Sequence, residues 1–154
     1  MRPNLWAALL ALIAAFAMSA SAYAQNERYE AGQVWAFSDR GIDEGALIKI
    51  QEVGQIGPKD EPMTVYHISM IGIAIPGQSD PIEISHIPVS REALDASVTA
   101  EANRDIEFPD YMEGKQNWEE ANGGVFTITL SEIASLIRDQ IAPQLAEEGI
   151  ALGG

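Results

Sequence analysis

The sequence contains no cysteine and few basic residues. Without cysteine the chain cannot form a disulfide, a thiolate zinc site or an iron–sulfur cluster, and it has neither a thiol nucleophile nor a cysteine to carry an N-terminal lipid. Lys and Arg number 9 against 23 Asp and Glu, which gives a formal net charge of −14. A nucleic-acid binder needs a basic stripe to neutralise phosphates, so we expect no nucleic-acid partner.

Long apolar runs are also scarce, and the longest one lies at the N-terminus. Arg2 precedes the uninterrupted apolar run 5–18. Small residues follow, and Ala22 and Ala24 form the A-x-A pattern that signal peptidase accepts. A membrane-spanning helix needs about 20 apolar residues, more than this run supplies. The segment 1–24 therefore predicts a signal peptide, cleaved after Ala24.

The mature chain would then be residues 25–154, one domain of 130 residues exported to the periplasm or secreted. It would hold 8 basic and 23 acidic residues, for a charge of −15. Nothing else in it is apolar for long enough to span a bilayer. Because it has no disulfides, its stability must come from an ordinary core, which a chain of this length can supply.

Short apolar runs separated by turn residues come before the helical patterns, an order that favours α+β. We expect a small antiparallel β-sheet or half-open barrel with two short helices and a packed C-terminal helix. The expected strands are 33–37, 46–53, 63–75, 82–89 and 125–129, and the segment 99–110 is expected to be irregular.

Helix signals follow the fourth strand. Ser90 is a credible N-cap for a helix over 91–98. Asp110 can cap a second helix over 111–121, which the Asn-Gly-Gly sequence at 122–124 would end. Thr129 and Glu132 form a capping box before a pattern of apolar residues at helical spacing (Ile133, Leu136, Ile137 and Ile141), which Pro143 should end or kink.

Two histidines, His67 and His86, lie in adjacent expected strands. In an antiparallel hairpin with its turn centred on Pro76 and Gly77, they would be directly opposite each other. Moving the turn centre by one residue keeps the two histidines on one face of the sheet, two positions apart. Moving it by half a residue places them on opposite faces. The two imidazoles are therefore candidate neighbours.

Such a pair has three interpretations. With a carboxylate it could bind a divalent metal such as zinc, or it could serve as a general acid or base near neutral pH. Alternatively, both histidines are hydrogen-bonded structural residues of a half-buried sheet. No H-x-x-x-H or H-x-H signature is present, so the structural interpretation is favoured.

The other polar and aromatic candidates have structural explanations. Trp35, Trp118 and Tyr111 are expected to anchor the core. Arg40 could clamp a carboxylate, although an internal partner such as Asp43 or Glu44 is the simpler interpretation. The acids around Arg40 lack calcium-loop spacing and suggest a solvated turn. No G-x-S-x-G elbow or phosphate-binding glycine loop is present.

Several short motifs occur in one order along the chain: G-Q-V-W-A-F-S-D-R at 32–40, Y-H-I-S at 66–69, H-I-P-V-S at 86–90, Tyr111 with Trp118, and G-V-F-T-I at 124–128. Together they resemble a family of small bacterial proteins with no assigned activity. The resemblance covers roughly 29–141. Family members tend to have Arg-Pro-Gly-Glu where this chain has Arg40 followed by Gly-Ile-Asp-Glu, without the proline. The resemblance implies a fold unit and no mechanism.

Taken together, the sequence predicts a non-enzymatic exported domain that contacts an envelope protein, and no cofactor motif is present. Its acidic surface would repel anionic headgroups and attract a basic partner. The alternative is a small metal-dependent or histidine-based hydrolase that uses His67 and His86.

Overall fold

The computed structural model describes residues 28–38 and 41–147, with side chains described up to Gln144. The fold discussed below belongs to the unit from Ala31 onward; residues 1–30 form a separate unit. The expected signal peptide, Arg40 and the C-terminal residues 151–154 lie outside the described residues. Among the residues described, none belongs to a helix long and apolar enough to cross a membrane.

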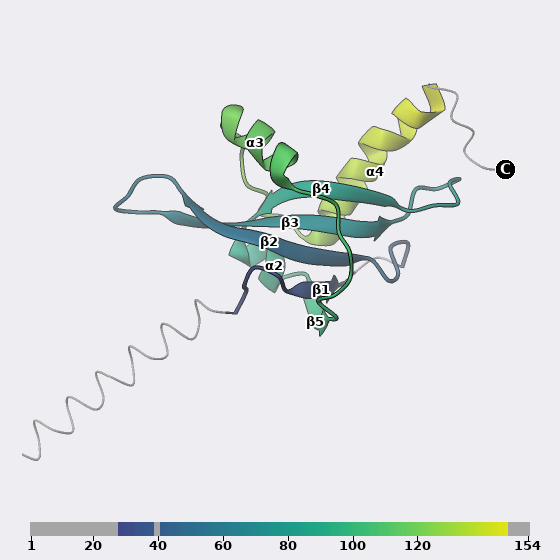
Figure 1. Ribbon diagram of the computed structural model, residues 1–154. Helices are drawn as coiled ribbons and strands as arrows, with labels where there is room; N and C mark the ends of the chain where they lie inside the picture. The colour runs from purple at the N-terminus through teal and green to yellow at the C-terminus, as the bar shows by residue number, and fades with distance from the viewer. Residues whose placement is uncertain (1–27, 39–40, 148–154) are drawn as a thin grey trace, which may run out of the picture. The chain divides into compact units, whose positions relative to one another are not determined.

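Five strands form one open sheet in which every pairing is antiparallel and the order is β4-β3-β2-β1-β5 (Figure 1). The strands are β1 (Val34–Phe37), β2 (Leu47–Ile56), β3 (Met63–Ile73), β4 (Ile82–Val89) and β5 (Val98–Ala102). Three helices accompany them: α2 (Arg91–Asp95), α3 (Met112–Glu120) and α4 (Leu130–Glu147). The predicted α+β class is confirmed, with an antiparallel sheet that does not close.

The two faces of the sheet differ in chemistry. One face carries fully buried apolar side chains from β2 and β3, which include Ile48, Ile50, Ile68 and Met70. Leu130, Ile133 and Ala134 of α4 are also fully buried. In Figure 1, α2 and the first turns of α4 lie on the opposite side of the sheet from α3. The apolar core therefore lies between the sheet and the α2 and α4 helices, and α3 lies over the more polar face.

Two of the three predicted caps are present. The N-cap of α3 is Tyr111, without a side-chain cap bond, although Asp110 accepts from the Met112 backbone N–H at 3.0 Å. The Ser90 hydroxyl accepts a hydrogen bond from the backbone N–H of Ala93 at 3.2 Å. At the start of α4, the Glu132 carboxylate accepts from the Thr129 backbone N–H at 2.9 Å, and the Thr129 hydroxyl accepts from the Glu132 N–H at 3.3 Å. These bonds satisfy helix amides that otherwise have no partner, which is why the sequence located both helix starts.

Two local expectations were wrong. Part of the segment expected to be irregular forms β5, which pairs with β1 and covers its outer edge. The expected strand at 125–129 is reduced to one bridge between Val89 and Phe126. Of the two outcomes expected at Pro143, the helix does not end there, because α4 continues to Glu147. Leu136 on that helix is 47% exposed. The secondary structure of such segments depends on contacts with distant parts of the chain, which local sequence patterns do not reveal.

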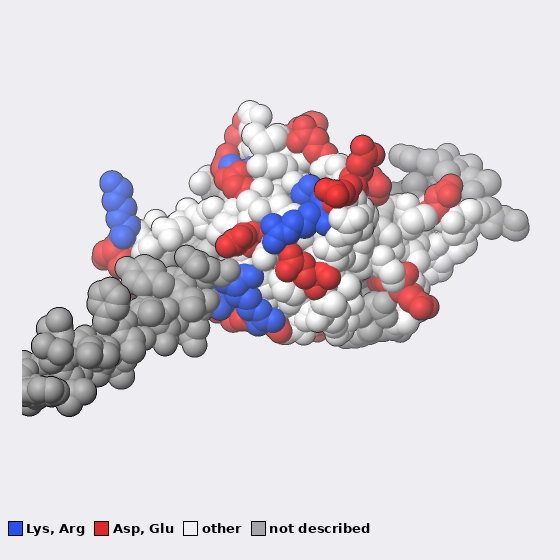
Figure 2. Space-filling view, turned by 60° about the horizontal axis from the view of Figure 1, so that its bottom comes forward, with Lys and Arg blue, Asp and Glu red and all other residues white. Residues whose placement is uncertain are grey.

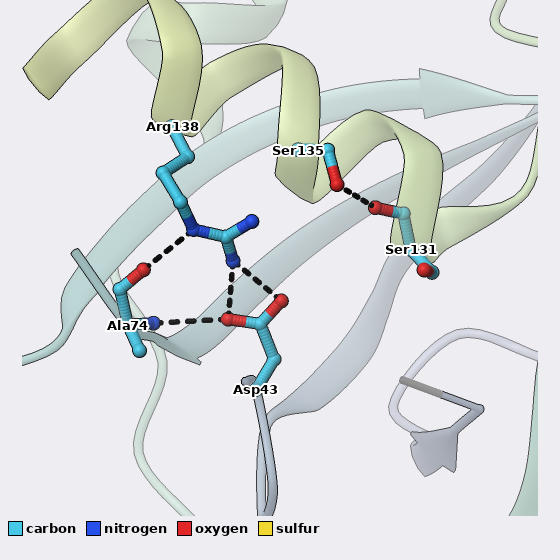
Figure 3. A network of polar contacts seen from close by, with 5 residues as sticks. All are labelled: Asp43, Ala74, Ser131, Ser135 and Arg138. Carbon is cyan, nitrogen blue, oxygen red and sulfur yellow. Dashed lines mark hydrogen bonds and ion pairs between the residues drawn. The ribbon is translucent and has the colours of Figure 1, made fainter. Parts of the chain in front are cut away.

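A buried ion pair joins the turn before β2 to α4 (Figure 3). The Nη2 atom of Arg138 lies 2.5 and 2.6 Å from the two Asp43 carboxylate oxygens. Arg138 also donates from Nε to the Ala74 carbonyl at 2.7 Å, and the Ala74 N–H donates to Asp43 at 3.0 Å. The prediction of a solvated turn was therefore wrong for Asp43, which is 4% exposed and has Arg138 as its partner.

Candidate functional site: a histidine pair under helix α3

The register of β3 and β4 brings the two histidines together. His67 is paired with Pro88, and Ile68 with Ile87, so His86 is two positions from the residue opposite His67. This is the expected alternative in which the turn centre lies one residue beyond Pro76 and Gly77. The register that would place His67 directly opposite His86 is not the one observed. A bulge follows between Ile68 and Met70. Diagonal neighbours on one face are within reach of ring side chains.

The two imidazoles bond to each other. The Nδ1 atom of His67 lies 2.9 Å from the Nε2 atom of His86, with ring centroids 5.2 Å apart and the planes inclined by 21°. One ring donates and the other accepts, according to their tautomers. The edge contact of the Trp118 indole with His67 has a centroid distance of 5.1 Å and an angle of 74°. The pair is therefore covered by an aromatic ring from α3.

Burial keeps the pair neutral at physiological pH. His67 is 2% exposed, and burial lowers its pKa. Burial, and after it the neighbouring His67, lowers the pKa of His86 to about 4. A proton on either ring would be poorly solvated and would lie against the other ring. Both effects act in the same direction, so both imidazoles are uncharged at neutral pH.

A polar network adjoins the histidines. Glu52 of β2 is the partner of His67 across the strands. Its Oε2 atom accepts a hydrogen bond from the Tyr111 hydroxyl at 3.0 Å, and its Oε1 atom lies 3.6 Å from Nζ of Lys115. Lys115 is also 2.5 Å from Glu119 on the same helix. The network ties α3 to β2 through side chains rather than through an apolar seam.

These contacts raise two further pKa values. Burial, followed by the hydrogen bond to Glu52, raises the pKa of Tyr111. The hydrogen bond to Glu119 raises the pKa of Lys115. The tyrosine therefore remains a hydrogen-bond donor and the lysine remains charged at neutral pH. Neither group is poised to exchange a proton there.

Glycine permits α3 to approach the sheet at His86. A Cβ atom on Gly114 would lie 2.6 Å from the Cβ of His86, a distance that real Cβ contacts do not reach. On β2, a Cβ on Gly54 would lie 3.5 Å from Nε2 of His67, an ordinary contact. Close approach at Gly114 matters because α3 has no fully buried residue of its own.

The predicted site residues have separate positions. His67, His86, Trp118 and Tyr111 belong to one cluster. Trp35 lies in β1, which β2 separates from β3, and its indole donates to the Gln33 side chain at 3.2 Å. Trp35 and Trp118 are both half-buried.

Sequence reasoning missed Glu52 and Lys115. A bulge between Ile50 and Glu52 places Glu52 across from His67, and no sequence pattern predicts that bulge. Lys115 gave a weak signal, since it stands at helical spacing from Tyr111 and Trp118 in the expected helix 111–121.

The described residues contain no group of three or more His, Asp and Glu side chains arranged to hold a metal ion. A structural zinc site takes four protein ligands, and a catalytic one usually takes three. The histidine pair and its surroundings in the described part of the chain thus do not make up such a ligand set. Chemically, the cluster can hold α3 against the sheet and titrate in acid.

Comparisons with known proteins add no further evidence, since no family model, no curated protein and no solved structure matches this chain. The resemblance to small bacterial proteins therefore has no support beyond the motifs themselves. The geometry of this chain alone carries the functional argument.

Proposed function

We propose that the protein is an exported, non-enzymatic domain that works by binding another protein of the cell envelope. Export is supported by the segment 1–24, with Arg2, the apolar run 5–18 and the A-x-A pattern ending at Ala24. The charge of −15 expected for the mature chain favours a basic partner surface and speeds its encounter.

The closed state of the histidine pair is the observation that carries the non-enzymatic part of the proposal. A general base must come within about 2.6–3.2 Å of the proton it removes. His67 is 2% exposed, and its Nδ1 atom is engaged with His86 under Trp118. The ring of His67 therefore faces other protein side chains, and a substrate would have to displace one of them to reach its Nδ1 atom; His86 is half-buried.

The surface supports a binding role through its distribution of charge. Figure 2 shows acidic and basic side chains interspersed on the face displayed. In the described chain, Arg91 pairs with Asp95 at i,i+4 spacing, and Arg104 pairs with Glu101 at i,i+3 spacing. A mixed surface suits a specific protein contact with matched charges better than it suits attraction to a uniformly charged polymer.

A histidine-based hydrolase remains the second candidate, on one specific observation. Neutral imidazoles, the Glu52 carboxylate and the Tyr111 hydroxyl converge on one side of the sheet, and neutral imidazole is the form that accepts a proton. This candidate requires α3 to move away from β4 so that His67, which is 2% exposed, meets solvent; His86 is already half-buried.

Three measurements test the proposal. Cross-linking of the mature protein in its native envelope fraction should give a defined adduct with a single partner at native abundance, and N-terminal sequencing should begin at Gln25. In parallel, hydrolysis of a panel of esters and phosphoesters should be no faster with the wild type than with a folded His86→Gln variant. Turnover that disappears in His86→Gln, without any adduct, would establish the hydrolase instead.

A further inference from the structure

A depression lies at the C-terminal end of α3, beside the Trp118 indole that covers the histidine pair. Its volume is about 290 Å³, and it is lined by Ile56 of β2 and by Trp118, Glu119, Asn122 and Gly123. Sites for small-molecule ligands measure roughly 300–1,000 Å³. This depression therefore suits one long side chain better than a whole cofactor.

The Trp118 indole in this depression is held in place on two sides. Its Nε1 atom donates to the Gly124 carbonyl at 2.9 Å, and its ring makes a T-shaped contact with the His67 ring. A fixed indole presents an electron-rich face, which attracts cations at distances up to about 6 Å. The same ring also packs against the methylene stem of a long charged side chain.

Negative charge is present at the same place. Glu119 lines the depression, and the hydrogen bond from Lys115 lowers its pKa, so the carboxylate is ionised at neutral pH. The Lys115 bond uses Oε1 of Glu119, and Lys115 also faces Glu52. The α3 helix ends at Glu120, and the C-terminus of a helix carries partial negative charge.

The shape of the depression depends on the turn after α3. A Cβ atom at Gly123 would lie 2.1 Å from Cδ1 of Trp118, so a larger residue there would displace the indole. Asn122 has a φ of 50°, in the left-handed region that asparagine tolerates better than most residues. The Asn-Gly pair thus ends the helix and leaves room for the indole.

We propose that this depression receives one lysine or arginine side chain of a protein partner. The aliphatic stem would lie on the Trp118 indole beside Ile56, and the charged head would meet the Glu119 carboxylate and the C-terminal end of α3. The inference rests on the proposed function, because it names the contact chemistry of a domain that binds a protein. The charge of −15 expected for the mature chain complements a basic segment over a longer range.

The test is an NMR titration of the mature protein with three peptides. One carries a single arginine in a glycine–serine background, one carries lysine, and one carries norleucine, which keeps the stem without the charge. The two basic peptides should shift the Trp118 indole N–H and the Gly123 amide saturably, and the shift should weaken with added salt. The Trp35 indole is an internal reference that should not move.

A matched pair of variants tests which carboxylate of α3 meets the basic side chain. Glu119→Gln and Glu120→Gln each remove one carboxylate from α3, and each carboxylate has an i,i+4 partner on that helix. Only Glu119 lines the depression. Glu119→Gln should weaken binding of the basic peptides about threefold to fivefold, the effect expected for an exposed ion pair, whereas Glu120→Gln should change it little.

Three results would overturn the inference: equal shifts with norleucine, equal effects of the two variants, or no shift at Trp118 with millimolar peptide. In any of these cases an envelope adduct in the cross-linking experiment would still support the binding function and would place the contact elsewhere. If the peptides bind as expected but cross-linking gives no adduct, the result would count against the proposed function and not against the binding of a basic side chain in the depression.

Discussion

Nδ1 of His67 and Nε2 of His86 lie 2.9 Å apart, in a pair formed by two strands whose register is offset by two residues from direct opposition. One proton is shared along that line, and a second proton would place a charge in a half-buried site. The pair is therefore a structural contact whose strength depends on pH. Its behaviour in acid is the most direct test of the geometry.

The stability of the protein should fall as pH decreases from about 6.5 to about 4. His86 has its pKa lowered to about 4 in the fold, whereas an unfolded histidine titrates near 6.5. In that window the unfolded chain binds more protons, so the stabilisation is complete above pH 6.5 and is lost as pH falls. Allowing for partial exposure, the loss is up to about 2 kcal/mol.

The measurement is urea unfolding at several pH values for the wild type and for His86→Gln. Carboxylates titrate in the same window in both proteins, so the difference between their slopes isolates the histidine. The variant should show the smaller dependence. Identical slopes would mean that the pKa of His86 is not lowered in the folded protein. That result would contradict the shielded His67–His86 contact.

Asp43 and Arg138 form the second buried polar contact, and removing one member should be costly. Asp43→Ala leaves the Arg138 guanidinium without its carboxylate in a site where Arg138 is 8% exposed. Breaking a buried pair costs about 3–5 kcal/mol, because the remaining charge is uncompensated. Asp95→Ala breaks the exposed pair with Arg91 and should cost less than about 1 kcal/mol.

A double variant separates the charge effect from lost packing. Replacing Asp43 by Leu and Arg138 by Met together removes both charges, and such replacements are often close to neutral in stability. The double variant should therefore be more stable than Asp43→Ala. If both unfold with the same free energy, the pair is not a desolvated one.

The sequence predicted those parts of the fold that depend on neighbouring residues. Ser90 and the Thr129–Glu132 box located two helix starts, because capping is a local hydrogen bond. Strand β4 was predicted with its observed bounds, since its alternation and flanking turns are both local. The His67–His86 contact followed from counting residues across one hairpin, although the register had to be left open.

What depended on distant pairing could not be predicted. Strand β5 forms because β1 has an edge to pair, and nothing in its own five residues indicates that partner. Glu52 meets the histidines because of a bulge between Ile50 and Glu52. The best local sign of the buried ion pair was Arg138 itself, four residues after the buried Ala134 on the inner face of α4.

Ser97 links two helices, and its hydroxyl should be hard to replace. It donates to the Ala93 carbonyl at 2.6 Å and accepts from the Leu130 N–H at 2.9 Å, and it is 2% exposed. Ser97→Ala leaves both backbone groups without this partner in a buried site, at a cost of about 1–3 kcal/mol. Ser135, which bonds only the Ser131 carbonyl, is the control; Ser135→Ala should cost less than half as much.

Gly114 should be required for α3 to rest on β4. An alanine there favours helix by up to about 1 kcal/mol, yet its Cβ would lie 2.6 Å from the Cβ of His86. Because the clash is between two Cβ atoms, which no side-chain rotation can separate, the helix must move. Overpacking of this kind costs about 1–3 kcal/mol. Gly114→Ala should therefore destabilise the protein and shift the Trp118 indole N–H signal. Gly124→Ala, where an added Cβ meets nothing within 4 Å, should change neither the unfolding free energy nor that signal. A stabilised Gly114→Ala variant with an unmoved Trp118 signal would show that α3 does not lie against His86.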